Sequence, residues 1–148
     1  MYPEESKALI RHIYEDCLSA HDLGKIDEYF APDYVDHALG TPGPMDREGF
    51  KQYIAMYFTA FPDGRFTIED VTVEGDKAAW RETFSGTHTG DLMGIPPTGK
   101  QVRIDGISYG RVRDGKAVEH WGSGDNLGML QQLGVIPMMG AAPAGAGA

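Results

Sequence analysis

The sequence has one cysteine, few basic residues and no long apolar run. Cys17 has no second cysteine with which to form a disulfide inside the chain. The 13 lysines and arginines face 22 aspartates and glutamates, which gives a formal charge of −9. So acidic a chain repels nucleic acid and anionic lipid, and we expect neither as a partner. No run reaches the roughly 20 apolar residues of a membrane span, and the acidic N-terminus does not resemble a signal peptide, so we expect a cytoplasmic protein.

The length of 148 residues suits one domain, because two domains of half this size would bury too little apolar surface. The composition changes near the end, where residues 137–148 are mostly alanine, glycine and proline. Such a segment cannot bury an apolar face. We therefore predict one folded domain over residues 1–136 and an extended or mobile tail over residues 137–148.

Helical periodicity dominates the first third of the chain. Apolar residues recur at a spacing of 3.6 from Ile10 to Leu18, which predicts an amphipathic helix that ends near Ala20. A short second helix is predicted after Gly24, and Pro32 is expected to stop it. A third helix, capped by an aspartate, is predicted between residues 46 and 61 after a short strand over residues 34–37.

From residue 65 onward the apolar period changes to two, which is typical of strands. The predicted strands cover residues 65–73, 77–88, 101–112 and 117–121. A closing helix is expected to be capped by Asp125 and packed by Leu127, Leu130 and Leu133. Helices followed by a meander of long strands indicate an α+β fold, and glycines within the strands allow sharp bends. We expect a curved antiparallel sheet with helices across its concave side and a pocket at its mouth.

Several short motifs occur in a recognisable order: Phe30-Ala31-Pro32-Asp33-Tyr34, Gly86-Thr87-His88-Thr89-Gly90, Gly94-Ile95-Pro96-Pro97-Thr98-Gly99, Asp114-Gly115-Lys116, Glu119-His120-Trp121 and Leu130-Gln131-Gln132-Leu133-Gly134. With them the chain resembles the SnoaL-like polyketide cyclases. This family shares the cone-shaped fold of nuclear transport factor 2, scytalone dehydratase and ketosteroid isomerase. The resemblance implies an NTF2-like barrel, with three N-terminal helices and a short C-terminal helix around a pocket for a small molecule.

In the characterised cyclases of that family, an aspartate just after the last strand is the acid/base of an intramolecular aldol ring closure. The resemblance places this position at Gly122, so the usual acid/base is missing from its place. Two further polar pocket positions of the family fall on Gly106 and Ser108, and a family asparagine corresponds to Asp36. The small replacements would leave a larger pocket.

The strand predicted over residues 77–88 supplies a candidate that does not depend on the resemblance. Alternation places Trp80, Glu82 and Phe84 on one face, and the large apolar groups indicate that this face looks inward. A carboxylate among aromatic rings has its charged form disfavoured, which raises its pKa toward the range useful to a general acid or base. The alternative is that Glu82 lies at the rim or pairs with an arginine.

The next two strands provide a pocket wall and a histidine. Ile104, Gly106 and Ser108 share one apolar or small face, and His120 shares a face with Gly122 on the last strand. Histidine exchanges protons near neutral pH, although a lone histidine on an apolar face is more often a hydrogen-bonded structural residue.

Three more groups complete the candidate site. Asp36 and His37 are adjacent on a strand, so only one points inward; the family register favours Asp36, and His37 would serve if the strand is twisted. Tyr53 and Tyr57 on the third predicted helix either line the pocket or fill the core. We expect no metal and no cofactor, because neither metal-ligand spacing nor a phosphate-binding glycine loop is present.

These features support three hypotheses of different classes. The first is a cofactor-independent enzyme resembling a polyketide cyclase, in which Glu82, His120 and Asp36 move protons during ring closure, isomerisation, dehydration or ring opening. The second is a non-catalytic binding or carrier domain, which the glycine at position 122 favours. The third is an interaction module whose pocket is filled by Trp80, Phe84 and Tyr57. Because a curved sheet can pair through its outer face, we also expect a homodimer or a higher homo-oligomer.

Overall fold

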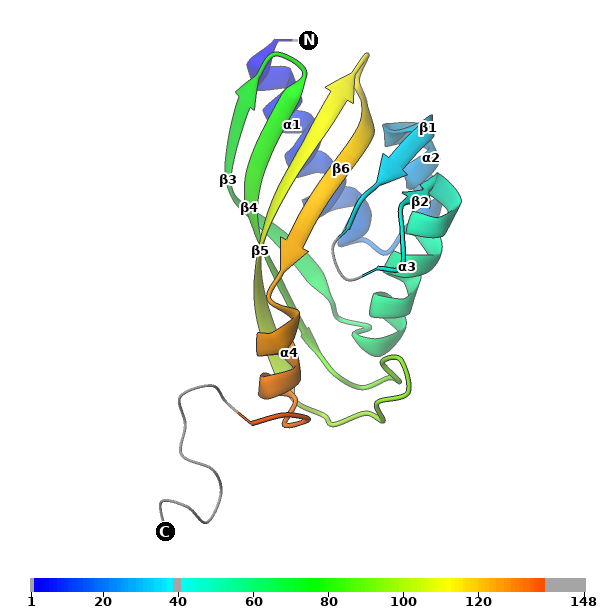
Figure 1. Ribbon diagram of the computed structural model, residues 1–148, viewed down its shortest axis with the longest axis vertical. Coiled ribbons are helices and arrows are strands. Elements are labelled where there is room, and N and C mark those ends of the chain that lie inside the picture. The colour runs from blue at the N-terminus through cyan, green and yellow to red at the C-terminus, as the bar shows by residue number, and fades with distance from the viewer. Residues whose placement is uncertain (1, 39–40, 138–148) are drawn as a thin grey trace.

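The computed structural model describes residues 2–38 and 41–137, which form one curved six-stranded sheet with helices packed on it (Figure 1). The strand order is β2-β1-β6-β5-β4-β3. The strands are β1 (Phe30–Asp36), β2 (Met45–Asp46), β3 (Arg65–Glu74), β4 (Lys77–Thr87), β5 (Gln101–Arg113) and β6 (Lys116–Gly124). Neighbours are antiparallel except for β1 and β6, which are parallel. The predicted α+β class and curved sheet are confirmed. Within the described residues the sheet stays open, with β2 and β3 at its edges.

The helices are α1 (Pro3–Arg11), which continues as a π-helix η1 (His12–Leu18), then the 3₁₀ turn η2 (Leu23–Lys25), α2 (Ile26–Tyr29), α3 (Arg47–Ala60) and α4 (Asn126–Gln132). The predicted aspartate caps are present. Asp46 Oδ1 accepts a hydrogen bond from Gly49 N at 2.7 Å, and Asp125 Oδ1 accepts one from Gly128 N at 2.8 Å. None of the helices in the described ranges is long and apolar enough to cross a membrane. The predicted tail lies, after Pro137, outside the described residues.

Two boundary predictions were wrong, and strand pairing explains both. The second helix does not extend to Pro32, because β1 already begins at Phe30. Pro32 is tolerated inside β1 because the pairing with β6 is irregular between Phe30 and Val35, so its missing N–H breaks no regular ladder bond. The last strand does not end at Trp121. It continues to Gly124, since residues 122–124 pair with β5.

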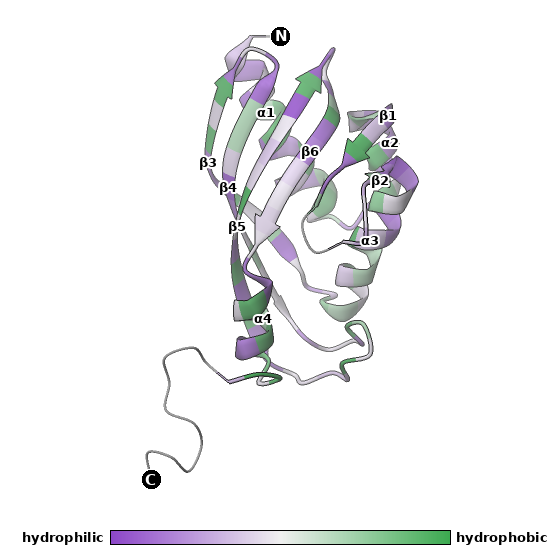
Figure 2. Cartoon of the chain, in the orientation of Figure 1, coloured by the Kyte–Doolittle hydropathy of each residue, from purple (hydrophilic) through white to green (hydrophobic). Residues whose placement is uncertain are grey.

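The packing predicted for the closing helix was wrong in one position. Leu127 is 48% exposed, whereas Met129 and Leu133 are buried. Three leucines spaced by three residues fit several helix faces, and the helix is too short for the pattern to select one. Buried and exposed residues alternate along β5, and along β4 as far as Glu82. Hydrophobic and hydrophilic bands accordingly follow one another on these strands (Figure 2).

The core has two parts that meet at Tyr14. The larger cluster joins α3 to the sheet through residues such as Phe50, Phe58 and Phe84. The smaller cluster lies under α1 and includes Ile10 and Trp80. Tyr14 packs against both clusters, so it stands at the inner end of the space between them.

Candidate active site

A cavity of about 140 Å³ lies between η1, α3 and the concave side of β4 to β6. Its apolar wall is formed by Leu18, Phe50, Ile54, Phe66, Phe84 and Ile104. The exposed residues Ser123, Gly124 and Asn126 also line it, so the cavity opens where β6 meets α4. The few polar side chains that line the cavity are thus surrounded by a largely apolar wall.

Asp36 and His120 form a buried pair at the inner end of this cavity. His120 Nδ1 donates to Asp36 Oδ2 at 3.1 Å, and the side chain of Asp36 is 1% exposed. Tyr34 Oη also donates to Asp36 Oδ2, at 2.7 Å, and the backbone N–H of Ala38 donates to Oδ1 at 2.8 Å. Burial alone would raise the pKa of Asp36, but these hydrogen bonds and the neighbouring imidazole outweigh it and lower the pKa. Asp36 is thus an ionised anchor for the imidazole ring.

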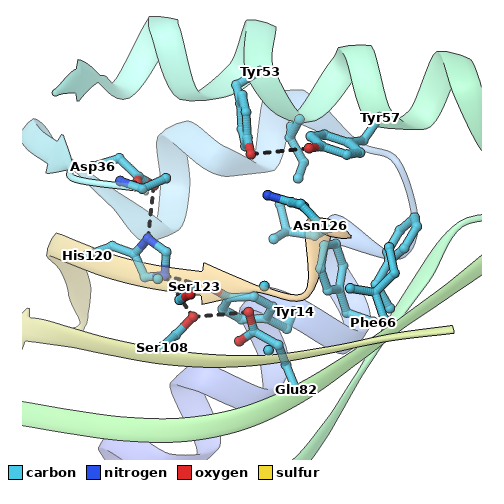
Figure 3. A pocket seen from close by; sticks show the side chains of 18 of the residues that line it. Tyr14, Asp36, Tyr53, Tyr57, Phe66, Glu82, Ser108, His120, Ser123 and Asn126 are labelled. Carbon is cyan, nitrogen blue, oxygen red and sulfur yellow. Dashed lines mark hydrogen bonds and ion pairs between the residues drawn. The ribbon is translucent and has the colours of Figure 1, made fainter. Parts of the chain in front are cut away.

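The other nitrogen of His120 continues the hydrogen-bonded chain. His120 Nε2 lies 3.0 Å from Ser108 Oγ, which in turn lies 3.0 Å from Glu82 Oε1 (Figure 3). Four side chains from β1, β6, β5 and β4 are thereby joined in one line. The backbone pairs Asp36 with His120 and Glu82 with Gly106 in the sheet, which fixes the spacing of the line.

Glu82 is the second carboxyl group of the line, at the opposite end from Asp36. Its pKa is raised, chiefly by burial, although the charge of His120 and the hydrogen bond from Ser108 oppose the rise. Glu82 Oε2 is buried without a hydrogen-bond partner. The two carboxyl groups of the site therefore have pKa values shifted in opposite directions, which is an arrangement that separates acid and base roles.

Tyr14 reaches the same point from the helical layer. It lies in the π-helix η1, where the Ser19 N–H bonds to the carbonyl of Tyr14 five residues earlier at 3.1 Å. Such wide turns are frequent at functional sites. Tyr14 Oη lies 3.4 Å from His120 Nε2. Burial, reinforced by the carboxylates of Glu82 and Asp36, raises the pKa of Tyr14 well above its usual range, so the phenol stays a hydrogen-bond donor.

The glycines on this wall make room for the polar line. A Cβ added at Gly122 would lie 2.7 Å from His120 Cε1 and 3.1 Å from Ser108 Oγ. A Cβ at Gly106 would lie 3.2 Å from Glu82 Oε1. His120 therefore occupies the space that a side chain at position 122 would need, so an aspartate there and the observed His120 rotamer exclude each other.

The structure brings most of the predicted site residues together. Asp36, Glu82 and His120 line the cavity, as do Tyr53, Tyr57, Phe84, Ile104, Gly106, Ser108 and Gly122. Glu82 is not paired with an arginine; its Oε1 accepts a hydrogen bond from Ser108, and its Oε2 is buried.

Two predicted site residues are not on the cavity wall. Trp80 is buried behind the site, with its ring 5.8 Å from that of His120. His37 points to the other side of the sheet, where its Nε2 lies 2.8 Å from Glu119 Oε2. Strand alternation explains the placement of His37, since Asp36 already takes the inward direction.

Tyr14 and Asn126 are two of the lining residues that the sequence reasoning missed. Tyr14 looked like an ordinary member of the apolar stripe of the first helix, and only the π-helical turn directs it to His120. Asn126 lies at the mouth, opposite Tyr53 and Tyr57 (Figure 3). Its signal in the sequence was its position directly after the capping aspartate. Tyr53 Oη donates to Tyr57 Oη at 3.4 Å, which leaves the Tyr57 hydroxyl proton free for a ligand.

The fold that encloses this polar line is of the NTF2-like class. The family model of the SnoaL-like polyketide cyclases matches residues 8–133, and the chain belongs to that family. It is 30% identical over 128 residues to the nogalonic acid methyl ester cyclase of Streptomyces nogalater, covering 79% of this chain and 91% of the relative.

Two further comparisons agree. The chain is 29% identical over 137 residues to the aklanonic acid methyl ester cyclase DnrD of Streptomyces peucetius, covering 85% of this chain and 88% of DnrD. The crystal structure of IdmH from Streptomyces antibioticus matches with a TM-score of 0.79 and 38% identity, over 86% of this chain and 97% of IdmH. In the part of the chain that the structure describes, no group of three or more histidine, cysteine or acidic side chains could hold a metal ion.

Proposed function

We propose that the protein is a cofactor-independent enzyme that closes a ring in a small, largely apolar polyketide by acid/base catalysis. The observation that carries this proposal is the Asp36–His120 pair at the inner end of an apolar cavity, 3.1 Å apart and shielded from water. An anchored imidazole in such a place is suited to remove a proton from carbon next to a carbonyl group.

The chemistry follows from the positions of three groups. His120 Nε2 takes the proton from the carbon, and the resulting imidazolium is stabilised by the ionised Asp36. Tyr14 Oη donates a hydrogen bond to the enolate oxygen that develops beside it. The enolate carbon attacks a second carbonyl carbon of the same molecule, and the new alkoxide takes up one proton. Substrate and product are isomers, because the proton lost from carbon is balanced by the proton gained by oxygen.

The dimensions of the cavity bear on the substrate. Ligand pockets that enclose a drug-sized molecule have volumes of about 300–1,000 Å³. The cavity here, at about 140 Å³, holds only the reacting end of a molecule as large as a polyketide methyl ester. The remainder would lie beyond Asn126 and Gly124. The names of the relatives make nogalonic and aklanonic acid methyl esters suitable first probes.

The experiment is to incubate the purified protein with each methyl ester and to separate the products by chromatography with mass detection. We expect a new compound of unchanged mass that carries one ring more, and its loss with His120→Ala. If calorimetry shows that both esters bind and both are recovered unchanged, the result would contradict catalysis. It would favour the carrier hypothesis, which the glycine at position 122 also supports.

A further inference from the structure

We propose that Ser108 carries a proton between Glu82 and His120, and that Glu82 is the proton store of the site. This inference rests on the proposed function and deepens it. It assigns the acid that protonates the alkoxide, a role that the resemblance places at position 122. Because position 122 is a glycine here, that acid has to come from another residue.

The geometry of Ser108 suits a relay. Its Oγ lies 3.0 Å from His120 Nε2 and 3.0 Å from Glu82 Oε1. A hydroxyl group donates one hydrogen bond and accepts others, so it can pass on one proton while it receives another. The side chain is 1% exposed, and water cannot easily replace it in the line.

Two arrangements of the same protons satisfy these contacts. In the first, Glu82 is a neutral acid that donates to Ser108, and Ser108 donates to the neutral His120. In the second, His120 is an imidazolium that donates to Ser108, and Ser108 donates to the ionised Glu82. The arrangements differ by two hops, Glu82 to Ser108 and Ser108 to His120, and no proton is gained or lost.

The surroundings favour the first arrangement in the resting protein. Glu82 is half-buried, its Oε2 atom is buried without a hydrogen-bond partner, and desolvation raises its pKa. The titratable groups in contact with this line are Asp36 from β1 and Tyr14 from η1, with Tyr34 behind Asp36. Tyr53 and Tyr57 from α3 and Asp105 from β5 line the same cavity. Asp36 already supplies the negative charge that the imidazole needs, so a second carboxylate nearby would be disfavoured.

The relay completes the catalytic cycle. While His120 holds the proton taken from carbon, Ser108 gives its hydroxyl proton to the alkoxide and receives the proton of Glu82. This leaves the second arrangement, and the two hops in reverse restore the first. The absence of a side chain at Gly122 matters here, because one would crowd His120 Nε2 and Ser108 Oγ at 2.9 and 3.1 Å.

The first test needs no substrate. Infrared difference spectra between wild type and Glu82→Gln near neutral pH should show the band of a protonated carboxyl group that the variant lacks. Glutamine is neutral like the protonated acid, so the nitrogen resonances of His120 at that same pH should be the same in both proteins. Glu119→Gln is the matched control and, among the histidines, should alter only the resonances of His37. A missing carboxyl band, or a clear change of His120 in Glu82→Gln, would overturn the proposal.

The second test uses turnover of whichever methyl ester is converted. Glu82→Gln and Ser108→Ala should each lower kcat by about 100-fold or more, and the double variant should be no slower, since both changes interrupt one relay. Additive losses would contradict the relay. If neither ester reacts, the proposed function fails in that assay, while the spectra still decide where the proton resides.

Discussion

The molecule contains two histidine–carboxylate pairs between β6 and the end of β1, one on each side of the sheet. Asp36 pairs with His120 on the concave side, and His37 pairs with Glu119 on the convex side. The nitrogen–oxygen distances, 3.1 Å and 2.8 Å, are similar. The exposure differs greatly: the inner side chains are 1% and 14% exposed, and the outer ones about 30% each.

The comparison shows that surroundings, more than residue types, decide what such a pair can do. The outer pair is solvated, His37 stacks on Trp121, and Glu119 is shared with Arg111 at 3.6 Å. Exposed pairs of this kind contribute about 0–1 kcal/mol. The inner carboxylate has three hydrogen-bond donors and a lowered pKa, and the imidazole that it anchors faces an apolar cavity. Only the inner pair can hold a proton away from water.

The largest expected effect separates the two histidines by activity. His120→Ala removes the proposed base, so ring closure should slow by about 100-fold to 10,000-fold, the range of general acid–base catalysis. His37→Ala removes the same side chain from the neighbouring position and should leave kcat within about twofold, since exposed pairs contribute little. Chromatographic assays of both variants give the ratio. Equal losses would abolish the distinction between the pairs.

The next effect separates the two carboxylates by stability. Asp36→Ala leaves the Tyr34 hydroxyl, the imidazole and a backbone N–H without their buried acceptor, so the free energy of unfolding should fall by about 3–5 kcal/mol. Glu119→Ala on the outside should cost about 1 kcal/mol or less. Denaturant titrations measure both. A loss below that of Glu119→Ala would show that the inner acceptor is dispensable.

A third variant tests whether the position of the His120 ring distinguishes the inner pair from the outer one. In Gly122→Ala the added methyl would meet His120 Cε1 at 2.7 Å, so the ring must shift. We expect a loss of about 1–3 kcal/mol of stability, as for other overpacked sites, together with lower turnover. Gly43→Ala is the matched control, because a Cβ at Gly43 would meet no atom within 4 Å. Gly75→Ala would not serve as a control, because Gly75 has a φ of 60°, at which an alanine is strained. Full activity in Gly122→Ala would show that the ring position is not critical.

The smallest effect sharpens the contrast through pH. The pKa of Glu82 is raised in the folded state, so its contribution to stability is complete below the unfolded value and is lost as pH rises through the folded value. Relative to Glu82→Gln, wild type should therefore lose stability as pH rises through that window. Asp36, with its lowered pKa, should behave oppositely: its contribution is lost as pH falls through the folded value. Unfolding curves from acidic to alkaline pH test both signs, and a pH-independent difference between wild type and Glu82→Gln would contradict the raised pKa.

The sequence was informative where a local pattern decides the structure. Alternation placed Glu82, Ser108 and His120 on the inner face, and the aspartate caps at Asp46 and Asp125 marked two helix starts. It was uninformative where distant segments decide. The parallel pairing of β1 with β6 and the π-helical turn that directs Tyr14 to the cavity depend on tertiary packing, which no local period encodes.

The pairing of β1 with β6 has a consequence for how the protein becomes competent. Asp36 and His120 are 84 positions apart in the chain, and they meet only when the first and last strands of the inner site lie side by side. Contacts between such distant segments form slowly, because the entropy cost of closing a long loop comes before the contacts can stabilise the chain. A chain that has emerged only as far as β5 can contain Glu82 and Ser108 and still lack a working centre. Activity therefore reports that the sheet has been completed.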